Sequence, residues 1–184
     1  MTTVLGLLAL QGALGAFDTL YFHEWRARLV ARGPEVYPEL RLHAGRSSIY
    51  GVVFAGLALF SWHGFWTGVL IALLLAEIVI TLADFVIEDR IRKPLGGLFP
   101  GERVTHAIMG IVYGAMLGYL VPTLAAWIRQ PTGLIRSVDA PDALKAVVLL
   151  MAVGVMVSGV RDWAATRGST WARYPWAEVS TPRP

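Results

Sequence analysis

The stretch Ala76-Glu77-Ile78-Val79-Ile80-Thr81-Leu82-Ala83-Asp84-Phe85-Val86-Ile87-Glu88-Asp89 decides the fold of this chain. It continues an apolar run that begins near Phe65, which predicts a membrane-spanning helix. Three acids interrupt the run: Asp84 follows Glu77 by seven residues and Glu88 follows it by eleven, so all three lie on one helical stripe. A carboxylate at bilayer depth costs about 2.5–3.5 kcal/mol or more, and such groups usually face the interior of a bundle. The stretch therefore predicts membrane helices packed around a polar interior.

The composition of the whole chain agrees with this prediction. Of its 184 residues 55% are hydrophobic and only 16% are charged, and the mean hydropathy is +0.56, which is too apolar for an ordinary soluble domain. The absence of cysteine excludes disulfides, thiolate metal sites and thiol catalysis. The net charge of +3 does not suggest a nucleic-acid partner. Because the N-terminal residues lack a basic segment, we interpret them as a retained first span and not as a signal peptide.

Five apolar segments predict an all-α integral membrane bundle with five transmembrane helices, the first four forming an antiparallel four-helix core. The predicted helices are 4–22 (continuing to about residue 30), 35–61, 65–92, 102–128 and 143–163. We expect residues 1–165 to form this single bundle and residues 166–184 to form a polar cytoplasmic tail. The first four helices are longer than the roughly 20 residues that a bilayer requires, and the excess lies at the cytoplasmic end.

The basic residues predict the orientation in the membrane. Thirteen of the 16 Lys and Arg residues would lie on one side and three on the other, which indicates that the first side is cytoplasmic. We therefore expect a protein of the inner or plasma membrane with its N-terminus outside and its C-terminus in the cytoplasm. The three residues on the outer side are Arg129, Arg136 and Lys145.

Candidate metal ligands gather at the cytoplasmic end. The second and fourth helices both carry Glu-x-x-x-His near their starts, as Glu39 with His43 and Glu102 with His106, and this spacing places each pair on one helix face. The first and third helices each contribute one acid level with a histidine and one acid about a turn or two deeper. These are Asp18, Glu24, Asp84 and Glu88.

This order of ligands along the chain resembles the ferritin-like di-metal carboxylate proteins, in which two helices each supply a Glu and two supply a Glu-x-x-His pair. The spacing here is one residue longer, but offsets of three and four residues both stay on one helix face. The resemblance implies two Fe, Mn or Zn ions bridged by carboxylates, which suits oxygen and nitrogen ligands without thiolate. With iron it implies a membrane oxidoreductase that acts on an apolar, lipid-like or quinone-like molecule taken from the bilayer.

Further polar residues share these faces. We expect Arg46, Tyr50, Tyr21 and Tyr113 to orient ligands and carry protons as catalytic partners. Glu77 lies deepest and is the candidate for a proton or substrate path. A small-xxx-small run on the fourth helix predicts close packing against a neighbour, and the sequence allows a homo-oligomer. This run consists of Gly110, Gly114 and Gly118.

Other interpretations of the same residues stay open. A haem-binding electron carrier would use only His43 and His106, and a proton or ion transporter would use Glu77, Asp84 and Asp18. The acids could also belong to a structural ion-pair network, for example Arg46 with Asp84. Glu102 could simply favour the start of its helix. His23 is expected to be an interfacial surface histidine.

Overall fold

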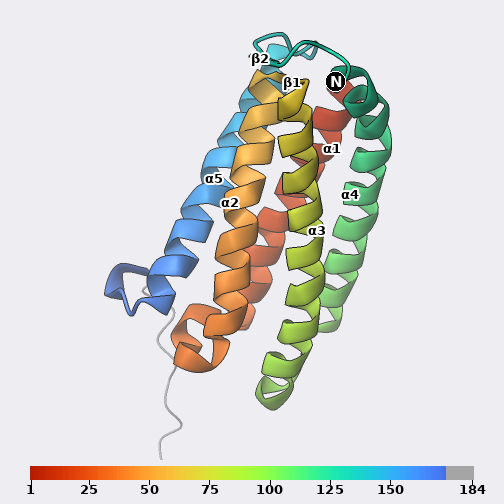
Figure 1. The fold of residues 1–184 in the computed structure, drawn as a ribbon. Coiled ribbons are helices and arrows are strands. Elements are labelled where there is room, and N and C mark those ends of the chain that lie inside the picture. Colours follow the sequence, from red (N-terminus) through yellow and green to blue (C-terminus); the bar gives the residue numbers. More distant parts are fainter. Residues whose placement is uncertain (173–184) are drawn as a thin grey trace, which may run out of the picture.

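The computed structural model describes residues 1–172. Five long helices lie side by side and alternate in direction (Figure 1). They are α1 (Thr2–Phe17), α2 (Tyr37–Leu59), α3 (Phe65–Arg92), α4 (Pro100–Trp127) and α5 (Asp142–Thr166). The all-helical fold with five long helices is thereby confirmed, while most of the predicted tail, residues 173–184, lies outside the described residues.

Short elements join the helices. The π-helix η1 (Asp18–Arg26) extends α1, and the 3-10 helices are η2 (Leu29–Val36), η3 (Lys93–Leu95) and η4 (Thr170–Ala172). Two strands that the sequence did not predict, β1 (Ser61–His63) and β2 (Gly133–Ile135), pair antiparallel across the end of the bundle where α2 and α4 finish, which we call the outer end. They tie the α2–α3 turn to the α4–α5 connection, and the Ser61 hydroxyl donates a hydrogen bond to the Ser137 carbonyl at 2.7 Å.

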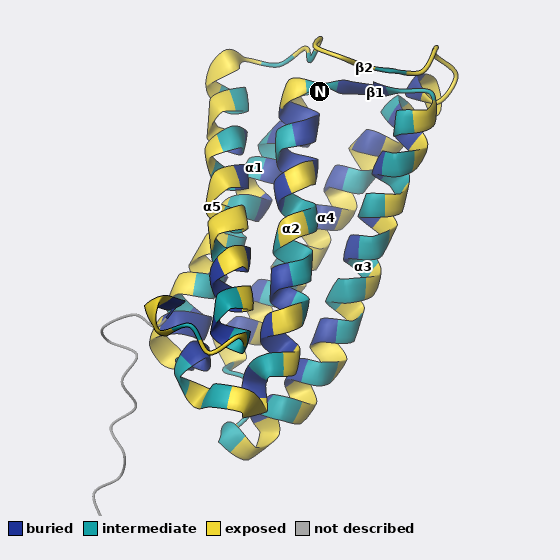
Figure 2. Cartoon of the chain, turned by 60° about the vertical axis from the view of Figure 1, so that its left-hand side comes forward, coloured by how far each residue is buried: buried dark blue, intermediate teal, exposed yellow. Residues whose placement is uncertain are grey.

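Four of the five helical segments are long and apolar enough to cross a membrane. They are Thr2–Arg26, Phe65–Leu95, Pro100–Trp127 and Asp142–Thr166. The second helix, which was also predicted to cross, is not among them because its first half carries charged residues. Large apolar side chains such as Phe65, Ile111 and Leu150 are exposed. Figure 2 shows exposed positions along the length of the helices. An apolar exterior of this kind fits a membrane protein.

The position of α5 corrects the predicted four-helix core. α5 packs most extensively against α2 and also against α1, whereas α1 and α2 make little direct contact. Gly159 allows α5 to approach α2 closely, because a Cβ atom added at this position would lie 2.7 Å from Ser47 Cβ of α2. The interior is therefore built by all five helices and not by the first four alone.

The glycine run on α4 does not face another part of the described chain. No atom lies within 4 Å of a Cβ added at Gly110, Gly114 or Gly118. Within residues 1–172 the predicted close packing of this face is therefore not formed.

The interior is layered along the bundle axis. A large apolar core fills the outer and middle part, with Leu8, Leu57 and Leu120 fully or almost fully buried. A second, smaller apolar cluster, which includes Val36 and Leu40, closes the opposite end, where α1 and α3 finish. We call this the inner end. Between the two apolar clusters lies a layer of charged side chains, which is thus shielded from water on both sides.

Candidate metal centre

The π-helix η1 determines which side chains of the first helix reach the polar layer. The predicted continuous α-helix to about residue 30 is wrong here, because the Ala27 N–H donates to the Phe22 carbonyl five residues earlier, at 2.8 Å. In an α-helix, residues five apart point about 140° away from each other. In a π-helix, bonded i to i+5, they share a face. Asp18 and His23 therefore both point inward, with exposed fractions of 2% and 4%.

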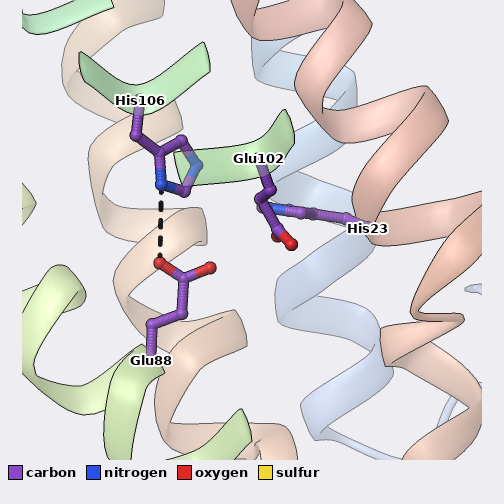
Figure 3. Close-up of side chains that lie close together, drawn as sticks. All are labelled: His23, Glu88, Glu102 and His106. Atoms are coloured by element: carbon purple, nitrogen blue, oxygen red, sulfur yellow. Dashed lines mark ion pairs between the residues drawn. The ribbon is translucent and has the colours of Figure 1, made fainter. Parts of the chain in front are cut away.

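Four side chains in the polar layer lie close enough together that they could hold a metal ion. His23 comes from η1, Glu88 from α3, and Glu102 and His106 from α4 (Figure 3). One ligand atom from each lies within 4.8 Å of the other three. The His23 Nε2 atom is 3.4 Å from Glu102 Oε1, and His106 Nδ1 is 3.7 Å from Glu88 Oε2. A tetrahedral ion with bonds of about 2.0–2.1 Å holds its ligands roughly 3.4 Å apart. The four side chains could therefore converge on one ion with small movements.

Asp18 orients His106. The Nε2 atom of His106 lies 3.1 Å from Asp18 Oδ2, so a proton on Nε2 would be donated to Asp18, while Nδ1 faces Glu88 Oε2 at 3.7 Å. Metal-binding histidines usually donate their other N–H to a carboxylate in this way. Asp18 Oδ2 is also 3.4 Å from His23 Nε2. Asp18, predicted as a ligand, thus contacts both histidines of the group.

Glu102 serves two roles through its two oxygens. Oε2 accepts a hydrogen bond from the Phe99 N–H at 3.3 Å, which stabilises the first turn of α4. Oε1 faces His23 and the guanidinium of Arg92, each at 3.4 Å. The helix-start interpretation of Glu102 is therefore correct, and it does not prevent this residue from belonging to the cluster.

Three of the predicted metal ligands are paired with arginines. Glu24 forms a two-pronged pair with Arg161 of α5, in which Nη2 lies 2.7 Å from Oε2. Glu39 accepts from Nη2 of Arg92 at 2.7 Å and from Nε at 3.1 Å. Asp84 Oδ2 lies 3.3 Å from Nη1 of Arg46. The ion pair of Arg46 with Asp84, expected as a structural alternative, is therefore present.

The arginines limit how much positive charge the polar layer can take up. Arg92 approaches Glu88 at 3.7 Å as well as Glu102 and Glu39, so it reaches three carboxylates from three helices. A buried guanidinium next to carboxylates neutralises charge that a second metal ion would otherwise neutralise. The described geometry brings together four donors for one ion, of which Glu88 and Glu102 also lie near Arg92. The other expected carboxylate ligands, Glu24, Glu39 and Asp84, lie outside this group and are paired with arginines.

His43 does not join the four donors. Its Nε2 atom lies 3.1 Å from Asp84 Oδ2, and its ring stacks on the ring of His23 with 4.7 Å between centroids. In the predicted haem site His43 and His106 would be the two ligands. Here each has a carboxylate partner at 3.1 Å. This pairing favours a carboxylate-rich ion site over a haem site.

Several buried polar atoms of the layer have no hydrogen-bond partner among the described residues. They are Asp18 Oδ1, His23 Nε2, Asp84 Oδ1 and Glu88 Oε1. Leaving a buried polar group unpaired costs about 1–3 kcal/mol, and more for a charged group. One of these atoms, His23 Nε2, belongs to the group of four donors and would be satisfied by a cation there, while Glu88 Oε1 lies 3.7 Å from Arg92. The chemistry of the donor set thus fits a metal ion.

The remaining predicted site residues lie elsewhere. Glu77 is buried and accepts a hydrogen bond from the Thr81 hydroxyl at 2.7 Å. Tyr113 packs edge-on against Tyr50, with ring centroids 6.1 Å apart, in the apolar core. Tyr21 stacks on Phe17 at 5.3 Å in an aromatic group outside the polar layer.

Sequence reasoning missed His23, Arg92 and Arg161. His23 was considered as an interfacial surface histidine, whereas the π-helical segment turns its side chain inward. The two arginines were read only as charges that orient the chain in the membrane, yet both are almost fully buried. The available signal was the surplus of acids at one depth, because buried carboxylates require cationic partners.

Comparison of this chain with protein-family models, with curated proteins and with solved structures finds no match.

Proposed function

We propose that this chain is a membrane-embedded metalloenzyme that holds one divalent ion between His23, Glu88, Glu102 and His106. The proposal rests on one observation: four donor atoms from three helical segments lie within 4.8 Å of one another in a water-shielded layer. The His23 Nε2 atom, which has no hydrogen-bond partner among the described residues, and the Asp18–His106 contact support it. No residue of this group is needed to close the bundle, because apolar clusters fill the interior on both sides.

The proposal revises the di-metal expectation to one ion, since Glu24, Glu39 and Asp84 have arginine partners. Two imidazoles and two carboxylates suit Fe, Mn or Zn. Iron or manganese would support the oxidoreductase that the sequence led us to expect, acting on a lipid-like or quinone-like molecule. Zinc would instead imply hydrolysis, because this ion has no redox chemistry.

Metal analysis of the purified protein tests the proposal. We expect about one equivalent of Fe, Mn or Zn per chain, and we expect His23→Ala and Glu88→Gln each to remove it. His63→Ala is the matched control, because His63 lies in strand β1 at the opposite end of the bundle. A chain without stoichiometric metal after expression in metal-supplemented medium would refute the metalloenzyme, as would full retention of metal in both ligand variants.

We also propose that the inner end faces the cytoplasm, as the distribution of basic residues predicts. The absence of cysteine makes this simple to test. Asp139 lies in the outer connection and Lys93 at the inner end, and both are exposed. A membrane-impermeant thiol reagent applied to intact cells should label Asp139→Cys and should not label Lys93→Cys. The reverse pattern would invert the topology.

Proton transport is the second candidate function, favoured by the burial of Glu77 in the apolar part of α3. Its electrostatic neighbours include Tyr50 and Arg46, and Arg46 contacts Asp84 of the polar layer. Buried acids of this kind are frequent in proton relays. Glu77→Gln should then abolish proton flux into liposomes that contain the protein, and absence of flux from the unaltered chain would exclude transport.

A further inference from the structure

A cavity of about 330 Å³ lies between α1, η1, α2 and α5, next to the proposed metal centre. It forms where α1 and α2 both pack on α5 but stand apart from each other. Its volume falls at the lower end of the range for small-molecule sites. Asp18 belongs both to the lining of this cavity and to the metal centre, through its 3.1 Å contact with His106.

The lining of the cavity is divided along the bundle axis. Its charged groups, Asp18, Arg46 and Arg161, lie at the inner end. On α5 the lining extends from Arg161 back to Met151, a length of about 15 Å at 1.5 Å per residue. Phe54 and Met151 form the far end, where a Cβ atom added at Gly12 would touch both side chains and where the cavity is therefore closed. A long, narrow site with charge at one end suits an amphiphile with one chain.

The cavity opens between α1 and α5 onto the apolar outer surface. Leu20 and Val157 line it and are 60% and 63% exposed. Gly154, also in the lining, is exposed and has no atom within 4 Å of an added Cβ atom. If the bundle lies in a bilayer, this opening faces lipid chains and not water.

Arg46 is the group that can bind a head group. It lines the cavity and contacts Asp84 through Nη1 at 3.3 Å, which leaves Nη2 and Nε outside that contact. The guanidinium of Arg161, in contrast, is bound to Glu24 and to the Ala172 carbonyl. The negative charge of Asp18 is already faced by two imidazoles. A guanidinium fork matches a carboxylate or a phosphate group.

We infer that this cavity binds a single-chain amphiphile with an anionic oxyacid head, which enters laterally between α1 and α5 and places its head at Arg46. That the amphiphile is a substrate rests on the proposed function, because the head would then lie beside Asp18 and the metal centre. Binding itself does not depend on the metal.

Photocrosslinking in nanodiscs of phosphatidylcholine tests the inference. The probe is dodecanoate with a diazirine at its chain end, and the competitors are dodecyl phosphate, dodecanol and dodecylamine. We expect crosslinks in the peptides that contain Phe54 or Met151, and we expect the two anions to bind roughly tenfold or more tighter than the alcohol. Competition by carboxylate alone or by phosphate alone would identify the natural head group. Equal competition by all four amphiphiles, or preference for the amine, would overturn the inference.

Two variants separate the cavity from the head-group site. Gly154→Leu should fill the opening and weaken every competitor, whereas Gly68→Leu, at an exposed helical glycine of α3 with equally open surroundings, should not. Arg46→Gln should remove only the preference for anions. If Arg46→Gln does not fold, Arg46→Lys keeps the charge without the fork and should reduce that preference. Unchanged binding in Gly154→Leu would refute the site.

Metal content measured on the same samples distinguishes the two proposals. A chain that binds the anionic probe but no metal would refute the metalloenzyme and leave the amphiphile site intact. A chain that holds metal but does not select anionic amphiphiles would refute the amphiphile site and leave the metalloenzyme intact.

Discussion

The pair of Glu24 and Arg161 offers the sharpest test of the polar layer. Arg161→Met would leave the Glu24 carboxylate, 4% exposed, without its two guanidinium hydrogen bonds, and would also remove the donor to the Ala172 carbonyl. Loss of one partner of a buried pair costs about 3–5 kcal/mol, because the other charge stays buried and uncompensated. We therefore expect the free energy of unfolding to fall by about that amount, and Glu24→Leu to cost a similar amount.

The double variant decides whether the pair acts as a unit. With both charges replaced by apolar side chains, neither member of the pair is left as an uncompensated buried charge, so the loss should be smaller than the sum of the single losses by about 2 kcal/mol or more. Tryptophan fluorescence during denaturation in mixed micelles would measure the free energy of unfolding of the two single variants and of the double variant. The exposed pair of Arg103 with Asp89 is the matched control, and its coupling should stay below about 1 kcal/mol. Additive losses for Glu24 and Arg161 would refute the reasoning.

Three further predictions follow from the geometry. Asp18→Asn should lower metal affinity about 10–100-fold in a chelator competition, because the carboxylate that orients His106 is lost, while Asp89→Asn at the surface should leave affinity unchanged. Gly159→Ala should lower the free energy of unfolding by about 1–3 kcal/mol through its collision with α2, whereas Gly68→Ala, in open space, should raise it slightly; a destabilised Gly68 variant would contradict this account. A metal ion at about a hundred times its Kd should stabilise the chain by about 2.7 kcal/mol in the same denaturation assay, and this gain should vanish in His23→Ala.

The helices could be predicted from the sequence because each is a long apolar run bounded by Gly, Pro or charged residues. The depth of the acids could also be predicted, since a helix converts distance along the chain into height. For this reason Glu88 and His106, which were expected at one level, do lie together. The order of helices around the bundle could not be predicted this way, because the local sequence of α5 does not determine that it packs against α1 and α2.

His23 shows where local rules fail. Its side chain faces inward because residues 18–26 adopt i to i+5 hydrogen bonds, a geometry that the α-helical period does not contain. The arginine partners show a second limit. Arg92 and Arg161 follow apolar helices and look like charges at a membrane surface, and only packing reveals that their guanidiniums turn into the bundle.

By itself the sequence determined that the chain is an apolar helical bundle with carboxylates and imidazoles gathered at one end. The physical reason is that hydropathy and helical rise are local properties of the chain. The tertiary structure alone decided which acids meet an arginine and which meet a histidine, because this choice depends on helix rotation and on which helices are neighbours. Asp84 and Glu88 of the opening stretch illustrate the division: four residues apart on one stripe, the first contacts Arg46 and His43, and the second lies with His23, Glu102 and His106.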